Sequence, residues 1–273
     1  MKIATVGKGG SGKTTLAGTL ARLLASDGQR LLAIDGDPNP NLALMLGLTP
    51  EQADRIVSIP PGIMELRGAE GERKLAMTLS PDELIARFAT SAPNDISLIV
   101  MGKPPDGSAG SGCMCASHLA VRGVIQEMSA FGDYTITDME AGLEHLKRGT
   151  ASNVDLMLVV AEPYYRSLEA AGRTWALAQE LSIPHVFVVA NKVKDDEDLA
   201  AIEAFCEKHG MPIIGVVNDE PAFAAAERAG LAPIDHAPNS PGILAIRSIA
   251  RKIGELPRQT VPPSSASFQP SVR

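Results

Sequence analysis

A short stretch near the N-terminus carries residue types that bind phosphate. Residues 7–15 read GKGGSGKTT, which meets the spacing G-x-x-x-x-G-K-T. In such a loop, backbone N–H groups close round the phosphates of a nucleotide at the positive end of a helix. Lys13 would neutralise the β- and γ-phosphates, and the Thr14 hydroxyl would hold Mg²⁺. We therefore predict a nucleotide-binding loop that comprises Gly7, Lys8, Gly9, Gly10, Ser11, Gly12, Lys13, Thr14 and Thr15.

Two other interpretations of this loop are weaker. Gly7, Gly9 and Gly12 also satisfy G-x-G-x-x-G, the pattern of a dinucleotide site. Such a site has no use for a lysine and a magnesium ligand after its last glycine, so Lys13 and Thr14 favour the first interpretation. A merely flexible turn is disfavoured because an apolar run, 3–6, precedes the loop and a helical apolar pattern follows it.

Carboxylates end two further predicted strands. Asp35 follows the predicted strand 30–34 and opens the segment DGDPNPNL, and Asp138 follows the predicted strand 134–137. At the carboxyl ends of parallel strands, next to a phosphate loop, carboxylates are placed to act on Mg²⁺ or on the attacking water. Residues 35–41 are equally typical of a polar turn that caps a short helix near 42–46, and both interpretations can hold.

A third predicted strand ends in polar residues, which are equally typical of an ordinary strand-end turn. The run 185–190 is followed by Asn191, Lys192, Val193 and Lys194. A guanine pocket would need aspartate at the position of Lys194, because a carboxylate there pairs with the ring N–H and the exocyclic amine. The lysine therefore favours ATP.

Two cysteines suggest a metal site. Cys113 and Cys115 form C-x-C at the end of a Gly/Pro/Ser-rich loop, just before a predicted helix. The positive end of that helix would favour the thiolate that binds metal. One pair supplies two ligands, whereas a closed tetrahedral site takes four, so a two-fold dimer would complete it. The alternative is two loop cysteines without a ligand role; Cys206 is expected to be a buried apolar residue.

Composition sets the wider limits. The chain has 273 residues, 45% of them hydrophobic, and a formal net charge of −7. This charge disfavours a nucleic-acid track or an anionic membrane surface as partner. No signal peptide or membrane-spanning run is readable, so we expect a cytoplasmic protein. We expect one domain over 1–255 and a disordered Pro/Ser-rich tail over 256–273.

The apolar runs and helical patterns predict a doubly wound, mostly parallel α/β sheet. Residues 49–93 carry little signal beyond one helix with a capping box, Ser80 to Glu83, and we expect a variable insertion there. The other expected strands are 96–101, 155–161 and 213–217, and the other expected helices are 167–181, 195–209, 220–229 and 240–253.

The second lysine of the loop, Lys8, resembles that of the deviant Walker A loop of SIMIBI P-loop ATPases, the class of MinD, ParA and the nitrogenase iron protein. The resemblance implies a nucleotide-sandwich homodimer in which Lys8 reaches the partner's phosphates. It also implies that Asp37 orients the hydrolytic water, that Asp35 supports Mg²⁺ from outside its ligand shell, and that Asp138 contacts Mg²⁺ through water. Asn191, with Lys192, would read the adenine.

Within this class, the segment DMEAGLEH after Asp138, with DGDPNPNL and GCMC, is similar to the CooC family of accessory ATPases that insert nickel into carbon monoxide dehydrogenase. The resemblance runs to about residue 250. It implies ATP hydrolysis, Ni²⁺ at Cys113 and Cys115 of a nucleotide-controlled dimer, and carbon monoxide dehydrogenase apoenzyme as client. Thiolate ligation alone would suit Zn²⁺ or an iron–sulfur cluster equally well.

Two alternatives remain. A positioning ATPase of the MinD or ParA type would not need the cysteines, and a membrane-bound MinD would end in a basic amphipathic helix that this chain lacks. An iron–sulfur ATPase of the iron-protein type is suggested by a cysteine shortly before Arg-Gly-Val-Ile at 122–125. It is disfavoured because the segment 138–150, where a second cluster cysteine would lie, contains no cysteine.

Overall fold

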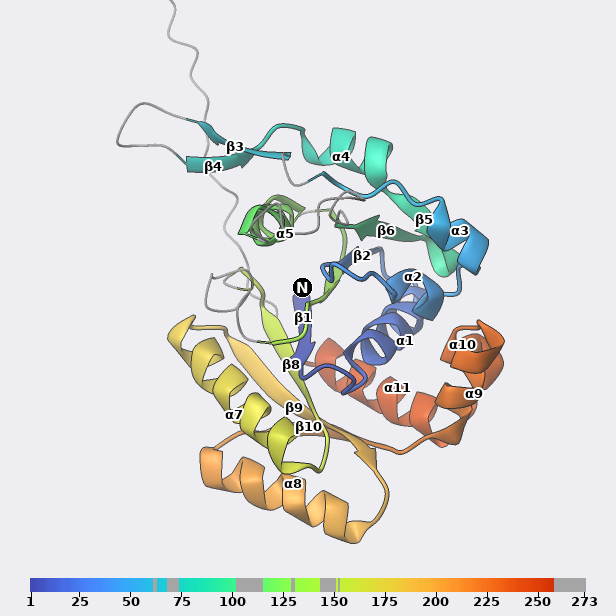
Figure 1. Ribbon diagram of the computed structural model, residues 1–273, viewed down its shortest axis with the longest axis vertical. Coiled ribbons are helices and arrows are strands. Elements are labelled where there is room, and N and C mark those ends of the chain that lie inside the picture. Colours follow the sequence, from blue (N-terminus) through green and yellow to red (C-terminus); the bar gives the residue numbers. More distant parts are fainter. Residues whose placement is uncertain are drawn as a thin grey trace, which may run out of the picture.

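The computed structural model describes residues 1–60, 63–67, 74–101, 115–128, 131–142, 151 and 153–257. Within them, the main element is a sheet of eight strands in the order β10-β9-β8-β1-β7-β2-β6-β5 (Figure 1). All neighbouring strands pair in parallel except β5, which is antiparallel to β6. The strands are β1 (Lys2–Gly7), β2 (Leu31–Asp35), β5 (Thr90–Ala92), β6 (Ile96–Val100), β7 (Tyr134–Asp138), β8 (Leu156–Ala161), β9 (His185–Val193) and β10 (Ile213–Asn218).

The strand order explains where a ligand can bind. β1 lies inside the sheet, between β7 and β8, and the chain leaves it for β2 on one side while β8, β9 and β10 extend the other side. In open parallel sheets, such a change of direction leaves a crevice at the carboxyl ends of the strands. The predicted doubly wound, mostly parallel α/β fold is confirmed.

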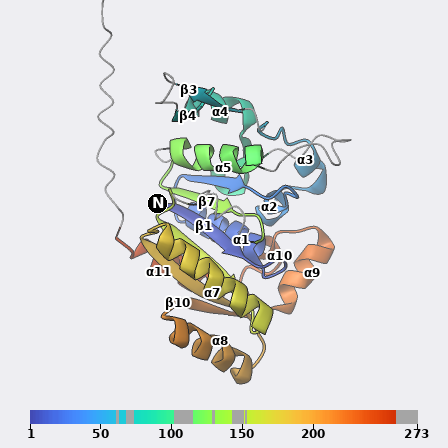
Figure 2. The same ribbon diagram turned by 60° about the vertical axis from the view of Figure 1, so that its left-hand side comes forward.

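Helices cover both faces of the sheet (Figures 1 and 2). One face carries α5 (Cys115–Glu127), α7 (Tyr165–Glu180) and α8 (Asp196–His209), which pack on one apolar cluster. The other face carries α1 (Lys13–Ser26), α2 (Leu42–Met45) and α11 (Pro241–Gly254), which pack on a second cluster. Because the central strands are buried on both faces, they consist of nearly continuous apolar residues, as parallel strands do.

Polar signals set the helix boundaries. The Ser80 hydroxyl accepts a hydrogen bond from the Glu83 N–H, and the Glu83 carboxylate accepts one from the Ser80 N–H, which begins α4 (Pro81–Phe88). The predicted capping box is therefore confirmed. The four helices predicted after residue 160 are all present, and their ends lie within two residues of the expected bounds. One of them is α9 (Pro221–Ala229), which precedes the short α10 (Pro233–His236).

Residues 49–93 contain more structure than the sequence indicated. Besides α4 and β5, the described part holds α3 (Pro50–Asp54) and an antiparallel hairpin of β3 (Met64–Arg67) and β4 (Lys74–Met77). The hairpin packs against α5, outside the main sheet (Figure 2). Its strands have four residues each, too few to show a periodic pattern along the chain.

Two predictions fall on residues outside the description. Residues 258–273 include nearly all of the predicted tail, so the boundary at 255 stays a prediction, although α11 ends at Gly254. Cys113 also lies outside, as does the side chain of Cys115, the first residue of α5.

None of the described helices combines the length and the apolar character that a membrane span requires.

Candidate functional site

The phosphate loop leaves β1 through glycines whose positions a side chain could not occupy. Gly7 and Gly12 have φ of 151° and 93°, in the region that favours glycine. A Cβ atom on Gly7 would lie 2.5 Å from the Val160 carbonyl oxygen, and one on Gly12 would collide with the Asn191 amide. The loop is therefore a fixed turn between β1 and α1, as the motif predicts.

The inner side of the loop brings the predicted magnesium-binding groups together. The Thr14 hydroxyl donates a hydrogen bond of 2.6 Å to Oδ2 of Asp138, and the Thr5 hydroxyl donates one of 3.0 Å to Oδ1 of the same carboxylate. Lys13 is buried, and its Nζ lies 3.4 Å from the Lys8 carbonyl oxygen. Hydroxyl and carboxylate oxygens are the ligands that Mg²⁺ prefers, so this donor set fits the ion.

Two buried carboxylates in this region titrate far above their ordinary range. Asp35 and Asp138 are register partners on the neighbouring strands β2 and β7. Burial, and next the charge of Asp138, raise the pKa of Asp35 to about 7. Burial raises the pKa of Asp138 to about 6, against the hydrogen bond from Thr14 and the charge of Lys13, which lower it. A bound cation would favour the charged form of both groups.

Asp35 also organises the turn that follows β2. Its Oδ2 accepts a hydrogen bond of 2.8 Å from the Leu42 N–H at the start of α2, and its Oδ1 accepts one of 3.2 Å from the Asp37 N–H. Asp37 is half-buried, and its own carboxylate accepts the Asn39 N–H at 2.8 Å. The capping interpretation of this turn is thus confirmed for Asp35, while the role of Asp37 towards water stays a prediction.

The end of β9 holds the outer side of the phosphate loop. The Asn191 amide donates a hydrogen bond of 2.7 Å to the Ser11 carbonyl oxygen. The Lys192 ammonium donates one of 2.5 Å to the Gly10 carbonyl oxygen and another of 3.0 Å to the carboxylate of Glu162, directly after β8. Asn191 and Lys192 therefore lie at the phosphate loop, and their contact with adenine stays a prediction.

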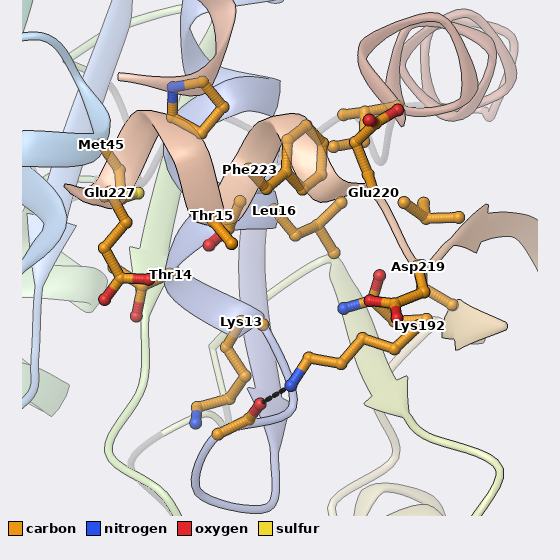
Figure 3. Close-up of a pocket in the computed structure, with 18 of the residues that line it drawn as sticks. Lys13, Thr14, Thr15, Leu16, Met45, Lys192, Asp219, Glu220, Phe223 and Glu227 are labelled. Carbon is orange, nitrogen blue, oxygen red and sulfur yellow. Dashed lines mark hydrogen bonds between the residues drawn. The ribbon is translucent and has the colours of Figure 1, made fainter. Parts of the chain in front are cut away.

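A cavity of about 630 Å³ opens beside the loop (Figure 3). Its phosphate end is formed by Gly10 and Gly12 to Leu16, and its far end by the short α2, the end of β10 and helix α9. The sequence did not indicate this far end, although a polar run following the apolar run 213–217 was available as a signal. The missed residues are Asn41, Leu44, Met45, Asn218, Asp219, Glu220, Phe223 and Glu227.

Close packing ties the walls of the cavity to α1. A Cβ atom on Gly18 of α1 would lie 2.5 Å from Cβ of Met45, so α2 rests directly on the α1 backbone. On the opposite wall, the Glu220 carboxylate accepts the Ala222 and Gly242 N–H groups at 3.1 and 3.0 Å and joins α9 to α11.

The dimer and metal predictions rest on other residues. Lys8 is exposed, as a residue that reaches a partner must be. The described residues contain no group of three or more His, Cys, Asp or Glu side chains that could hold a metal, but Cys113 and the Cys115 side chain are not among them. Cys206 is buried as predicted, and burial raises the pKa of its thiol to about 11.

Comparison with known proteins places this geometry in a family. The model of the CobQ/CobB/MinD/ParA nucleotide binding domain matches residues 2–234. The carbon monoxide dehydrogenase accessory protein CooC of Rhodospirillum rubrum is 36% identical over 87% of this chain and 91% of its own. An uncharacterized ATP-binding protein of Methanocaldococcus jannaschii is 38% identical over 84% of this chain and 90% of its own.

Among solved structures, the cell division ATPase MinD of Pyrococcus furiosus superposes with a TM-score of 0.70 at 20% identity, covering 94% of this chain and 99% of its own. At that identity the likeness concerns the fold. The chain therefore belongs to the CobQ/CobB/MinD/ParA family of nucleotide-binding domains, in which it is an ATPase of the CooC type.

Proposed function

We propose that this ATPase is a maturation factor that assists nickel insertion into carbon monoxide dehydrogenase. The observation that carries the proposal is the 36% identity over 87% of the chain with a protein named as an accessory protein of that enzyme. The GCMC motif at 112–115 adds a thiol pair suited to a soft or borderline metal. The client would be the dehydrogenase apoenzyme, in the cytoplasm.

The ATP step would use the residues of the phosphate loop and its two carboxylates. Lys13 would neutralise charge on the β- and γ-phosphates, and Asp37 would orient the water that attacks the γ-phosphorus, with ADP as leaving group. Mg²⁺ held at Thr14 and Asp138, and supported by Asp35, would offset phosphate charge. The partner's Lys8 would complete the site, so hydrolysis would occur only in a closed dimer.

Base recognition would occur in the cavity, next to the phosphate loop. Asn191 lies beside the loop and in the cavity lining, which supports a contact with adenine. The residue that follows the strand is Lys194, which cannot accept the two hydrogen bonds that guanine offers. ATP is therefore the proposed substrate.

Metal handling would depend on Cys113 and Cys115 from two protomers. Four thiolates satisfy a closed tetrahedral site for Ni²⁺ or Zn²⁺, whereas one protomer supplies two. ATP would close the dimer and bring the pairs together, and hydrolysis would open it. Nucleotide turnover would in this way control capture and delivery of the metal.

The test combines metal content and assembly. Metal per protein and particle mass are measured with and without ATP for the wild type, for Cys113→Ala/Cys115→Ala, and for Cys206→Ala, a control at the buried cysteine. The proposal expects about one metal ion per dimer, lost only in the double variant. Nickel-dependent activation of the apoenzyme should be lost with it.

Equal, low metal content in all three proteins would instead favour a positioning ATPase. The positioning-ATPase hypothesis is supported by the 27% identity with the septum site-determining protein MinD of Bacillus subtilis over 92% of this chain. A visible absorption band in anaerobically purified protein would favour an iron–sulfur ATPase.

A further inference from the structure

The ends of β8 and β9 form a charged contact beside the phosphate loop. Glu162 follows β8 directly, and its side chain is only 10% exposed, whereas that of Lys192 is 42% exposed. The carboxylate oxygen and the ammonium nitrogen lie 3.0 Å apart, and the same ammonium reaches the Gly10 carbonyl. Figure 3 shows Lys192 extended from the end of β9 towards the loop.

The end of β9 supplies hydrogen-bond donors to the outward-facing carbonyl groups of the phosphate loop. A loop that binds phosphate turns N–H groups inward, so neighbouring carbonyl oxygens point outward and need other donors. Here consecutive residues of one strand supply two donors, since Asn191 binds the Ser11 carbonyl and Lys192 the Gly10 carbonyl. The end of β9 thus fixes the peptide groups on which the shape of the loop depends.

The backbone of Lys192 indicates that its position is imposed. Its φ is 57°, a left-handed conformation that a residue with a side chain rarely adopts. Such conformations persist where the surroundings hold them, and they concentrate at functional sites. In this case the register of β9 with β10 shifts at Lys192, since Val217 pairs with Asn191 and Asn218 with Val193. From this irregular position the Lys192 side chain extends to the Gly10 carbonyl and the Glu162 carboxylate.

We propose that Glu162 is a positioning residue for nucleotide binding, which acts through Lys192 on the Gly10 peptide. It holds the ammonium on the outer side of the loop and so keeps the phosphate-binding N–H groups in place before the nucleotide arrives. The proposal rests on nucleotide binding at this site and is independent of metal delivery.

The direction in which nucleotide affinity changes distinguishes a positioning role of Glu162 from a purely electrostatic one. A carboxylate close to a phosphate site repels the ligand, so its removal would strengthen nucleotide binding if charge alone mattered. Loss of positioning works in the opposite direction. A weaker affinity after removal of the carboxylate charge therefore identifies the positioning role.

The experiment measures dissociation constants of Mg-ATP and Mg-ADP by displacement of a fluorescent ATP analogue from the full chain. Glu162→Gln should weaken both nucleotides by about tenfold, as expected for loss of a charge-assisted hydrogen bond. Both should weaken because both nucleotides need the phosphate loop in its binding shape. In steady state, KM for ATP should rise while kcat changes by less than about twofold.

Matched variants complete the test. Glu169→Gln makes the same substitution at the exposed pair with Arg173 on α7, where the atoms lie 3.6 Å apart, and should change neither constant. Lys192→Met should weaken binding by itself, and adding Glu162→Gln to it should cause no further loss of affinity. If Glu162→Gln unfolds, the comparison of the double variant with Lys192→Met still reports whether Glu162 acts through Lys192. Unchanged or tighter binding in Glu162→Gln, or an equal loss in the Lys192→Met background, would overturn the proposal.

Discussion

The two ends of the cavity are built on different principles. The phosphate end is one contiguous loop held by hydrogen bonds to Asp138, Asn191 and Lys192, all more than 120 residues away in the chain. The far end is assembled from several segments, which combine polar residues such as Asp219 and Glu227 with packing surfaces such as Leu44 and Phe223. Directional hydrogen bonds tolerate little displacement, whereas packing surfaces adjust. We therefore expect changes at Lys13 and Asp138, within the phosphate end, to affect the reaction and changes at the far end to affect affinity.

The largest effect is expected at Lys13. Lys13→Met removes the only buried ammonium among the described residues of the loop, and with it the stabilisation of charge that develops on the transferred phosphoryl group. The ATP hydrolysis rate should fall by about 100-fold or more. Phosphate release under saturating Mg-ATP measures it, with Lys208→Met on the exposed side of α8 as control. A rate within a few-fold of the wild type would contradict the assignment.

Asp138 should show opposite effects on activity and on stability. Asp138→Asn should lower hydrolysis by roughly 10- to 100-fold, because it weakens the oxygen donor set next to Thr14. The nucleotide-free variant should nevertheless be more stable, by roughly 1 kcal/mol at neutral pH, since it no longer ionises a carboxyl group whose pKa burial raises to about 6. Urea unfolding measures the second effect, and a less stable variant would refute the argument from burial.

At the far end, Phe223→Ala should change affinity without changing chemistry. Phe223 lines the cavity on α9, and loss of its apolar contact should raise KM for ATP by about tenfold with kcat nearly unchanged. The matched control is Phe205→Ala on α8, whose ring packs against His209 at 4.4 Å and lies outside the cavity lining. A fall in kcat equal to the rise in KM would remove the distinction between the two ends.

The smallest effect is a pH dependence that belongs to the phosphate end. The pKa of Asp35 is about 7 in the folded protein against 3.8 ordinarily, so the folded state binds the proton more tightly. Protonation of Asp35 makes its full contribution to the free energy of unfolding below about pH 4, and this contribution is lost as the pH rises towards about 7. Urea unfolding across this range should show the decline for the nucleotide-free protein. Asp35→Asn should remove part of the decline and leave the part due to Asp138, whose pKa is about 6. Mg-ADP with the wild type should flatten it.

The same contrast explains what could be predicted from the sequence. The phosphate loop is local in the chain, and Asp35 and Asp138 follow apolar runs whose ends parallel strands bring to one edge. The far wall has no motif: the polar run 218–220 after the apolar run 213–217 lacks a spacing that marks a site, and apolar residues on α9 resemble core residues. Glu162 could have been selected in the same way as Asp35, because it is an acidic residue directly after a buried strand. Its contact with Lys192 could not be predicted, because it depends on β8 and β9 being neighbours in the sheet.

The contact of Gly18 with Met45 has a mechanical consequence. Where most packed helices are separated by side chains that can change rotamer, α1 and α2 meet almost backbone to backbone. No compliant layer is present to absorb a displacement of α2. We expect any shift of the Asp35–Asp37 turn to be transmitted to the first helix with little loss, so that the two ends of the cavity respond together.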